Sequence, residues 1–118
     1  MQHRHHAIDY IELSVDDVTA AKAFYSDAFG WSFNDYGLEY AGIIDPRGGE
    51  IGGLTRVDSV SRGGPCVLLF SEDLETTREA VTAAGGTTRE PYDFPGGRRF
   101  HFTDPFGNEL GVWAQPAT

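Results

Sequence analysis

The sequence predicts an α+β fold in which one strand–helix–strands unit occurs twice. In each half, a strand pattern leads through an Asp into a helix pattern that ends at glycine. Asp17 and Asp73 lie 56 positions apart, and Gly30 and Gly86 show the same spacing. The motif Asp-Pro-x-Gly-x-Glu-Ile/Leu-Gly begins at residue 45 and again at residue 104, 59 positions later. Two copies are too few for a solenoid, so we expect the units to pair with each other.

The first unit is predicted to begin with a strand over residues 8–15 and a helix over about 18–29. Asp17 supplies a side-chain oxygen for the helix N-cap, and Gly30 suits a left-handed residue that ends the helix. Extended segments are expected at 31–34, 39–44 and 50–56. The first strand has an apolar face, which suits the helix, and a polar face: Ile11, Leu13 and Val15 against Tyr10, Glu12 and Ser14.

The second unit is predicted to contain a strand at 67–70 and a helix at about 74–84, followed by extended segments at 98–103 and 109–115. The segment 98–103 has the same division into faces: Phe100 and Phe102 against Arg99, His101 and Thr103. We expect residues 89–97, with two aromatics, to form a loop that is either a plain connection or a lid.

These elements predict a single domain over 1–118. Its first module covers about 7–57, a linker about 58–65, and the second module about 66–116.

Composition excludes several classes of partner. Nine basic and eighteen acidic side chains give a net charge of −9, which removes the usual electrostatic attraction to nucleic acid. No apolar run approaches the length that spans a bilayer, and the first six residues lack the apolar stretch of a signal peptide. The single cysteine, Cys66, permits no intrachain disulfide, which fits a reducing compartment. We therefore expect a cytoplasmic protein with no nucleic-acid or membrane partner.

The polar sheet faces are the candidate binding surface. Each unit has one helix, which covers only one face of its sheet, so the polar faces are expected to line a shared trough for a small molecule. The alternative is that these faces are simply exposed to solvent, as in many antiparallel sheets. Glu12 and His101 form the candidate acid–base pair, since carboxylate and imidazole exchange protons near neutral pH. The alternative is that Glu12 pairs with Arg99 or another cation and that His101 only lines the trough. The expected ligand-binding residues are Tyr10, Glu12, Ser14, Tyr40, Arg99, His101, Thr103 and Trp113.

Other residues have competing interpretations. Tyr10, Tyr40 and Trp113 are either aromatic walls for a planar or cationic ligand or ordinary core. The tract His3, His5, His6 is expected to belong to a mobile terminus rather than to bind metal. Cys66 is expected to be a small buried side chain rather than a nucleophile.

Three stretches, 8–31, 72–86 and 98–113, resemble the vicinal oxygen chelate superfamily. The first contains Ile-x-Tyr-Ile-Glu-Leu-x-Val-x-Asp and then Phe-Tyr-x-x-x-Phe-Gly-Trp, and the last ends Asp-Pro-Phe-Gly-Asn-Glu-Leu-Gly-Val-Trp. This is the glyoxalase, bleomycin-resistance and dioxygenase group. The resemblance implies two βαβββ modules whose mixed sheets curve around a ligand crevice, and a homodimer.

The resemblance also implies four positions where members of the family hold a divalent metal. Carried over to this sequence, the positions are Tyr10, Gly52, Gly111 and either Pro65 or Cys66. Glycine offers no side chain and a neutral phenol is a poor ligand, so Cys66 is the only plausible ligand among these residues. No metal or other cofactor is therefore predicted.

The function implied is metal-free binding of a small molecule, as in the drug-sequestering members. One alternative is a glyoxalase-type lyase or isomerase, or a dioxygenase, that uses Glu12 and His101 with or without a metal at a rearranged site. The other alternative is a non-catalytic module that binds a partner protein.

Overall fold

The computed structural model describes residues 3–60, 64–105 and 108–116. The chain divides into two compact units, which are described separately. The first unit is Tyr10–Pro65, and the second joins Gln2–Asp9 to Cys66–Thr118. The α+β fold class with two modules is confirmed. The shared crevice and the module boundaries stay predictions, and residues 61–63 of the expected linker lie outside the described residues.

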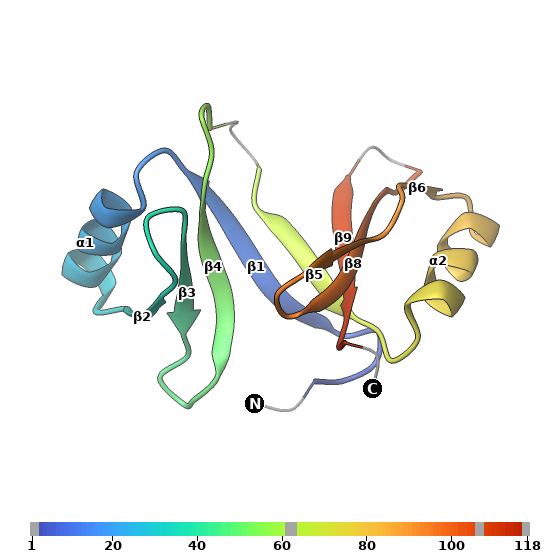
Figure 1. Cartoon of the computed structure of the whole chain (residues 1–118), viewed down its shortest axis with the longest axis horizontal. Coiled ribbons are helices and arrows are strands. Elements are labelled where there is room, and N and C mark those ends of the chain that lie inside the picture. The colour runs from blue at the N-terminus through green and yellow to red at the C-terminus, as the bar shows by residue number, and fades with distance from the viewer. Residues whose placement is uncertain (1–2, 61–63, 106–107, 117–118) are drawn as a thin grey trace. The chain divides into compact units, whose positions relative to one another are not determined.

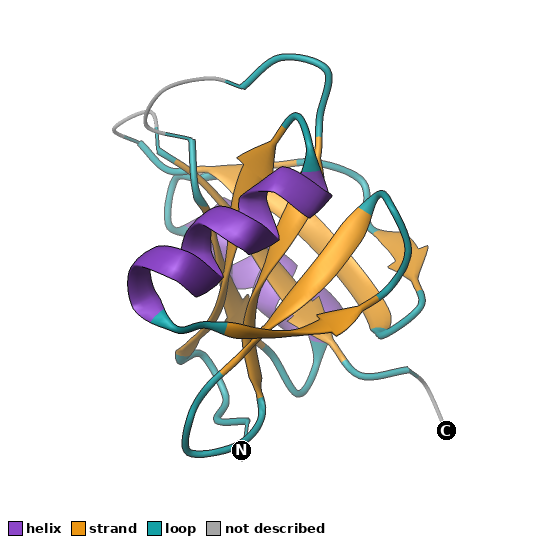
Figure 2. Cartoon of the chain, turned by 90° about the vertical axis from the view of Figure 1, so that its left-hand side faces the viewer, coloured by secondary structure: helices purple, strands orange, loops and turns teal. Residues whose placement is uncertain are grey.

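The first unit contains the predicted strand and helix with the predicted bounds. Its elements are β1 (Ile8–Val15), α1 (Val18–Phe29), β2 (Ser32–Asp35), β3 (Tyr40–Ile44) and β4 (Glu50–Arg56). The strands lie in the order β2-β3-β4-β1, with β1 parallel to β4 and the other neighbours antiparallel. Figure 1 shows α1 and these strands, and Figure 2 shows α1 running across one face of them.

The face of this sheet that α1 covers is apolar. Helix α1 packs against β2, β3 and β4, and Ala41, Ile43 and Leu54 are buried there. Leu13 of β1 pairs with Leu54, as expected from the apolar face of the first strand. Ile11 on the same side remains 44% exposed, opposite Gly52, which offers no side chain to cover it. The opposite face of the sheet carries the polar residues.

The second unit repeats this arrangement with one insertion. Its elements are β5 (Cys66–Phe70), α2 (Leu74–Ala83), β6 (Thr87–Thr88), β7 (Tyr92–Phe94), β8 (Gly97–Thr103) and β9 (Glu109–Ala114). The order β5-β9-β8-β6, with β5 parallel to β9, matches β1-β4-β3-β2 (Figure 1). The apolar core joins α2 to one face of this sheet through Leu74, Phe100, Val112, Ala114, Val81 and Phe102. Phe100 and Phe102 therefore lie on the predicted apolar face of β8.

The prediction of a loop over residues 89–97 is wrong for its second half. Tyr92–Phe94 form β7, which pairs antiparallel with β8. Pro95 and Gly96 make the short connection between the two strands, so residues 92–103 form a hairpin. An ion pair of 2.8 Å between Arg98 Nε and Asp93 Oδ1 links the strands. Proline and glycine are typical of loops, so the segment was predicted to be a loop although its two aromatic residues favour a strand.

The duplicated motifs have matching local structures. Asp17 and Asp73 are both N-caps, whose Oδ1 atoms accept from Ala20 N at 3.0 Å and from Thr76 N at 3.2 Å. The two Asp-Pro turns also correspond. Asp45 N donates to Gly49 O at 2.9 Å, and Asp104 N donates to Asn108 O at 2.8 Å. Phe106 and Gly107 of the second motif lie outside the described residues.

The histidines near the N-terminus are held by the second unit, so the expectation of a mobile terminus is wrong for them. His3 Nδ1 bonds to Asp9 Oδ1 at 2.9 Å, and the His3 ring stacks on Phe70 with 5.0 Å between ring centroids. His5 Nδ1 accepts from Glu72 N at 3.0 Å, and His6 Nε2 lies 2.9 Å from Thr77 Oγ1. Most of these contacts join residues far apart in the sequence, and a local sequence pattern does not reveal such contacts.

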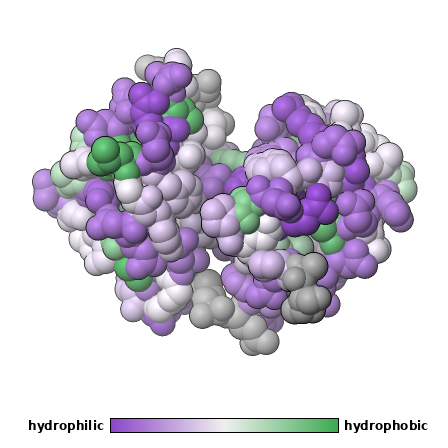
Figure 3. Space-filling model, in the orientation of Figure 1, coloured by the Kyte–Doolittle hydropathy of each residue, from purple (hydrophilic) through white to green (hydrophobic). Residues whose placement is uncertain are grey.

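Hydrophilic residues cover most of the face drawn in Figure 3, and apolar residues appear there as separate patches. Among the large apolar side chains left exposed are Phe24 and Phe29 of α1 and Leu38 of the β2–β3 connection. Neither described helix combines the length and the apolar character needed to cross a membrane.

The charge of the Asp73 cap is expected to make the stability of the protein depend on pH in the acid range. The backbone hydrogen bond from Thr76 holds the pKa of Asp73 below its ordinary value. A lowered pKa in the folded state stabilises the protein above the ordinary pKa of aspartate, and this contribution is lost as the pH falls through the lowered value. We therefore expect the melting temperature of Asp73→Asn, which retains a capping oxygen, to fall less in acid than that of the wild type.

Melting curves from about pH 7 to about pH 2 measure this difference. Asp73→Ala, which also removes the cap, should melt at a lower temperature already at neutral pH. Glu79→Gln, on the same helix, is the charge control. If Asp73→Asn and the wild type lose stability in parallel through the acid range, the Asp73 contribution is absent.

Candidate functional site

The polar face of the first unit holds two hydrogen bonds from phenols to carboxylates, and the two phenol oxygens lie next to each other. Tyr40 Oη donates to Glu12 Oε2 at 2.9 Å. Tyr10 Oη lies 2.9 Å from Tyr40 Oη and donates to Glu50 Oε2 at 2.8 Å. The order is thus Glu12–Tyr40–Tyr10–Glu50. We call these four residues the tyrosine–glutamate network; β1 supplies Tyr10 and Glu12, β3 supplies Tyr40, and β4 supplies Glu50.

Glu50 is the member of this network that the sequence analysis missed. Its Oε1 also accepts from Tyr36 Oη at 2.6 Å and from Asn34 Nδ2 at 3.1 Å. The signal was present, because Glu50 is the glutamate of the repeated Asp-Pro motif. The corresponding Glu109 of the second unit lies 3.8 Å from His101 Nδ1 through its Oε2. In each unit, the motif glutamate lies near a candidate site residue.

Two glycines let the network lie close to the sheet. A Cβ atom at Gly53 would stand 1.9 Å from Tyr40 Oη, and one at Gly42 would stand 2.0 Å from Glu50 Oε1. Gly42 and Gly53 pair with each other on β3 and β4, so they form a backbone floor beneath the phenol and the carboxylate. Only glycine leaves room for this arrangement.

The phenols of the network stay neutral far into the alkaline range. Burial raises the pKa of Tyr10 above its ordinary value, and the hydrogen bonds to Tyr40 and Glu50 raise it further. Burial also raises the pKa of Tyr40, and the charge of Glu12 adds to this shift. The hydrogen bond to Glu50 raises the pKa of Tyr36. These groups therefore present uncharged hydroxyls next to two carboxylates.

Alkaline solution is expected to destabilise the protein through these phenols. Unfolded tyrosines ionise near pH 10.0, whereas Tyr10 and Tyr40 retain their protons at higher pH in the fold. Their stabilising contribution is complete below the ordinary tyrosine pKa and is lost as the pH rises above it. Denaturant unfolding at about pH 8 and about pH 11 should give a steep loss in the wild type.

The double variant Tyr10→Phe/Tyr40→Phe tests the source of this loss, because it removes both hydroxyls and should flatten the alkaline dependence. Tyr25→Phe on α1, outside the network, is the control and should retain the wild-type slope. An unchanged slope in the double variant would assign the alkaline loss to other groups.

The polar face of the second unit centres on His101. The His101 Nε2 atom lies 3.1 Å from Tyr92 Oη, with the two rings stacked 6.0 Å apart. Cys66 is half-buried, and its Sγ atom lies 3.9 Å from His101 Nδ1. His101 pairs with Gly111 across β8 and β9, and a Cβ at Gly111 would meet the imidazole at 3.4 Å. This imidazole has a thiol, a phenol and a carboxylate as neighbours.

Arg99 and Trp113 continue this face and pair across β8 and β9. The Arg99 guanidinium carbon lies 5.9 Å from the centre of the Tyr92 ring and 5.7 Å from that of Phe94. Trp113 Nε1 donates to Asp9 Oδ2 at 2.9 Å. Arg99 and Trp113 are thus held by aromatic and polar contacts inside the second unit, and Arg99 is buried.

The expected ligand-binding residues fall into two groups. Tyr10, Glu12 and Tyr40 meet in the first unit, and Ser14 follows on the same face of β1, opposite Thr55 of β4. The second group belongs to β8 and β9: Arg99, His101, Thr103 and Trp113. Glu12 and His101 belong to different units, so their action as an acid–base pair stays a prediction.

Three of the four residues at the family's metal positions do not suit a metal, and the fourth position falls on Pro65 or Cys66. Tyr10 offers a neutral phenol that donates to Glu50, while Gly52 and Gly111 have no side chain. Borderline cations such as Zn²⁺ bind imidazole, thiolate or carboxylate, and hard cations prefer oxygen ligands such as carboxylate. Within residues 3–60, 64–105 and 108–116, no three or more His, Cys, Asp or Glu side chains form a group able to hold a metal ion.

Comparison with known proteins identifies the family. The family model for the Glyoxalase/Bleomycin resistance protein/Dioxygenase superfamily matches residues 7–112. The anthracycline biosynthesis protein DauV of Streptomyces sp. (strain C5) is 31% identical over 113 residues, which cover 90% of this chain and 40% of DauV. A glyoxylase-like domain-containing protein of Didymella fabae is 32% identical over 93 residues, 70% of each protein.

Solved structures agree on the fold. A variant of the methylmalonyl-CoA epimerase of Streptomyces coelicolor, in complex with 2-nitronate-propionyl-CoA, superposes with a TM-score of 0.74 at 16% identity. The match covers 97% of this chain and 100% of the epimerase chain. The chain spans only about 40% of the length of the anthracycline biosynthesis proteins it matches. By the family-model match and the sequence identity, this chain belongs to the Glyoxalase/Bleomycin resistance protein/Dioxygenase superfamily.

Proposed function

We propose that this chain is a glyoxalase/bleomycin-resistance-like protein that binds a small molecule on its polar sheet faces without a metal. The tyrosine–glutamate network carries this proposal. At Tyr10, where the family resemblance implies a metal ligand, the chain has a phenol that donates to Glu50. The network combines neutral hydroxyls, carboxylates and aromatic rings, which are groups that orient a ligand by hydrogen bonding and stacking.

A planar aromatic molecule is the first ligand class to test. The similarity to the two anthracycline biosynthesis proteins supports this choice. Tyr10 and Tyr40 supply aromatic rings beside hydrogen-bonding groups in the first unit, and Trp113 and Tyr92 do so in the second. Phenolic and ketone oxygens of such a ligand would find both donors and acceptors on these faces.

Fluorescence titration with an anthracycline, with and without a chelator, tests the proposal. We expect saturable binding that the chelator does not change. Tyr40→Phe removes the donor to Glu12 and leaves a polar carboxylate with one partner fewer, so it should weaken binding about threefold to tenfold. Tyr25→Phe, on α1 in the same unit, should bind as the wild type does.

Binding that appears only after Ni²⁺, Zn²⁺, Mn²⁺ or Fe²⁺ is added would contradict the metal-free proposal. If an anthracycline does not bind, a thermal-shift screen with a metabolite and antibiotic library applies the same test to other ligands, since a specific ligand raises the melting temperature. No shift with any compound would argue against small-molecule binding.

Acid–base catalysis is the second candidate function. The contacts of His101 with Tyr92 and of Glu12 with Tyr40 favour it, because each candidate proton carrier is oriented by a phenol. Glu12→Gln should then abolish turnover of a ligand that it still binds. A Glu12→Gln variant with full activity would exclude Glu12 as the base. Assays on the hemithioacetal of methylglyoxal with each divalent ion test the metal-dependent lyase.

We also propose that the chain works as a homodimer. The family match supports this assembly, because the resemblance to that family implies a homodimer. Light scattering coupled to size-exclusion chromatography measures the mass in solution, and a monomer at all concentrations would contradict the homodimer.

A further inference from the structure

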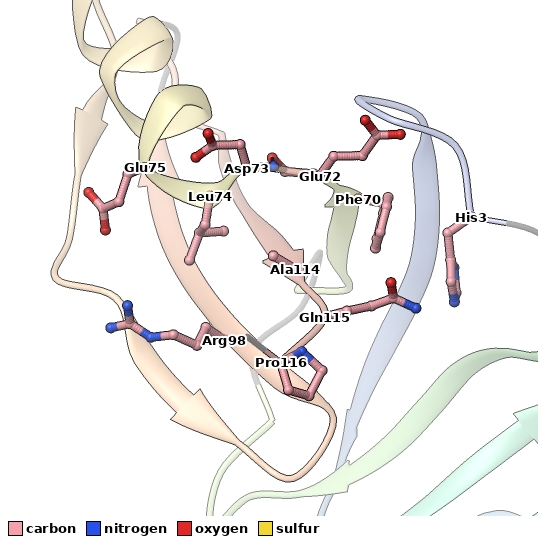
Figure 4. A pocket seen from close by; sticks show the side chains of 11 residues that line it. His3, Phe70, Glu72, Asp73, Leu74, Glu75, Arg98, Ala114, Gln115 and Pro116 are labelled. Carbon is pink, nitrogen blue, oxygen red and sulfur yellow. Dashed lines mark hydrogen bonds between the residues drawn. The ribbon is translucent and has the colours of Figure 1, made fainter. Parts of the chain in front are cut away.

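A partly open pocket lies on the second unit at the beginning of α2 (Figure 4). Its volume is about 680 Å³, within the range of roughly 300–1,000 Å³ that small-molecule sites occupy. It is apart from the polar face around His101, because none of the residues next to that imidazole lines it. Neither the proposed function nor the metal positions of the family involve this pocket.

Apolar side chains form the inner wall of this pocket. Phe70, Leu74 and Ala114 are all more than nine-tenths buried, and Pro116 adds an apolar ring at the end of β9. In Figure 4, Leu74 and Ala114 lie toward the middle of the pocket, with Arg98 and Pro116 on the side opposite Glu72. An apolar body of a few carbon atoms would replace water on this wall favourably.

The polar groups at the pocket favour a cation. Glu72, Asp73 and Glu75 line the α2 side, whereas Arg98 is already paired with Asp93 at 2.8 Å. The amino end of a helix commonly binds anions. In α2 the Asp73 carboxylate already occupies this anion position, because its Oδ1 accepts from Thr76 N at 3.2 Å. An added anion would therefore meet carboxylates rather than free backbone donors.

The N-terminal segment closes one side of the pocket and is fixed before any ligand binds. His3, which lines the pocket, stacks on Phe70 and meets Trp113 edge-on with 4.9 Å between ring centroids. The bonds of His5 to Glu72 N and of His6 to Thr77 hold the residues that follow. A preformed wall lowers the entropic cost of binding.

We propose that this pocket is a second ligand site that takes a protonated amine carried on a small apolar or aromatic body. The ammonium group lies toward the acidic side chains at the beginning of α2, and the apolar body lies against Phe70, Leu74 and Pro116. The site is independent of the tyrosine–glutamate network, since all of its lining residues belong to the second unit.

Amide NMR titration with three matched probes tests the site. Phenethylamine, 3-phenylpropionate and 2-phenylethanol share an aromatic body and differ in charge at neutral pH. We expect phenethylamine to shift the amides of residues 70–75 and 114–115 saturably and to bind at least fivefold more tightly than 3-phenylpropionate. The neutral alcohol should lie between them, since it retains the apolar contact alone.

The double variant Glu72→Gln/Glu75→Gln tests the charge. It should lower the affinity for phenethylamine roughly twofold to fivefold, because an exposed ion pair contributes a factor of about 2 to 5. It should leave the affinity for 2-phenylethanol unchanged. Glu79→Gln is the matched control on α2, because Glu79 does not line the pocket, and it should behave as the wild type does. Asp73 is left intact in every variant to preserve the helix cap.

Three results would overturn the proposal. They are equal affinity for the carboxylate and the amine, an unchanged amine affinity in the double variant, and shifts confined to residues outside the pocket. Tyr40→Phe should not change amine binding, and the double variant should not change anthracycline binding. Failure of this site is therefore distinguishable from failure of the proposed function.

Discussion

Replacing Phe100 by alanine is expected to destabilise the second unit by about 3–5 kcal/mol, the largest effect of any single change predicted for this protein. Phe100 has no exposed surface and packs with Leu74, Val112 and Ala114 between β8, β9 and α2. Removing the ring takes away this burial and leaves a cavity that the sheet and helix cannot fill. Because a domain has only about 5–15 kcal/mol of net stability, much of it would be lost.

Denaturant unfolding followed by circular dichroism measures this loss. Phe24→Ala is the matched control, because Phe24 is 60% exposed on α1 and its truncation should change the free energy of unfolding by less than about 1 kcal/mol. Phe100→Leu, which retains part of the volume, should fall between the two. Equal losses for Phe24→Ala and Phe100→Ala would contradict the assignment of Phe100 to the core.

Replacing Gly53 by alanine is expected to break the tyrosine–glutamate network. The added Cβ would stand 1.9 Å from Tyr40 Oη and 2.3 Å from Tyr40 Cζ, so the ring must leave its place over the sheet. The hydrogen bond to Glu12 is then lost, and the protein loses about 1–3 kcal/mol of stability through overpacking. If the proposed function holds, affinity for the ligand should fall at least as far as in Tyr40→Phe.

A double-mutant cycle isolates the cause, because all three of the nearest atoms to the added Cβ belong to Tyr40. In a Tyr40→Ala background, Gly53→Ala should cost little, since the clashing ring is gone. The difference between the two backgrounds is the coupling free energy of residues 40 and 53, measured by denaturant unfolding. Additive losses in the two backgrounds would mean that the clash with Tyr40 is not what destabilises Gly53→Ala.

Much of the fold could be predicted because local signals repeat. The N-caps at Asp17 and Asp73 and the alternation of the first strand are short-range patterns, and they gave α1 and β1 their observed bounds. Strand β7 was missed because Pro95 and Gly96 indicate a loop, whereas pairing with β8 makes Tyr92–Phe94 a strand. Propensity does not include the pairing of a segment with its neighbouring strand.

The site was only partly predictable for a related reason. Alternation placed Tyr10 and Glu12 on one face of β1, and Tyr40 was proposed as an aromatic wall beside them. The partners Glu50, Tyr36 and Asn34 depend on the antiparallel register of β2, β3 and β4, which the sequence pattern does not specify. A glutamate that recurs in a duplicated motif is the signal that would have identified Glu50.

The assignment of Gln2–Asp9 to the second unit links distant parts of the chain. His6 N donates to Phe70 O at 2.6 Å, and Phe70 N donates to Ala7 O at 3.1 Å, so β5 depends on residues made well before it. During translation, the amino-terminal segment of the second unit is therefore synthesised before the first unit, and the remainder of the second unit is synthesised after it. A fragment starting at Cys66 would therefore lack these backbone partners.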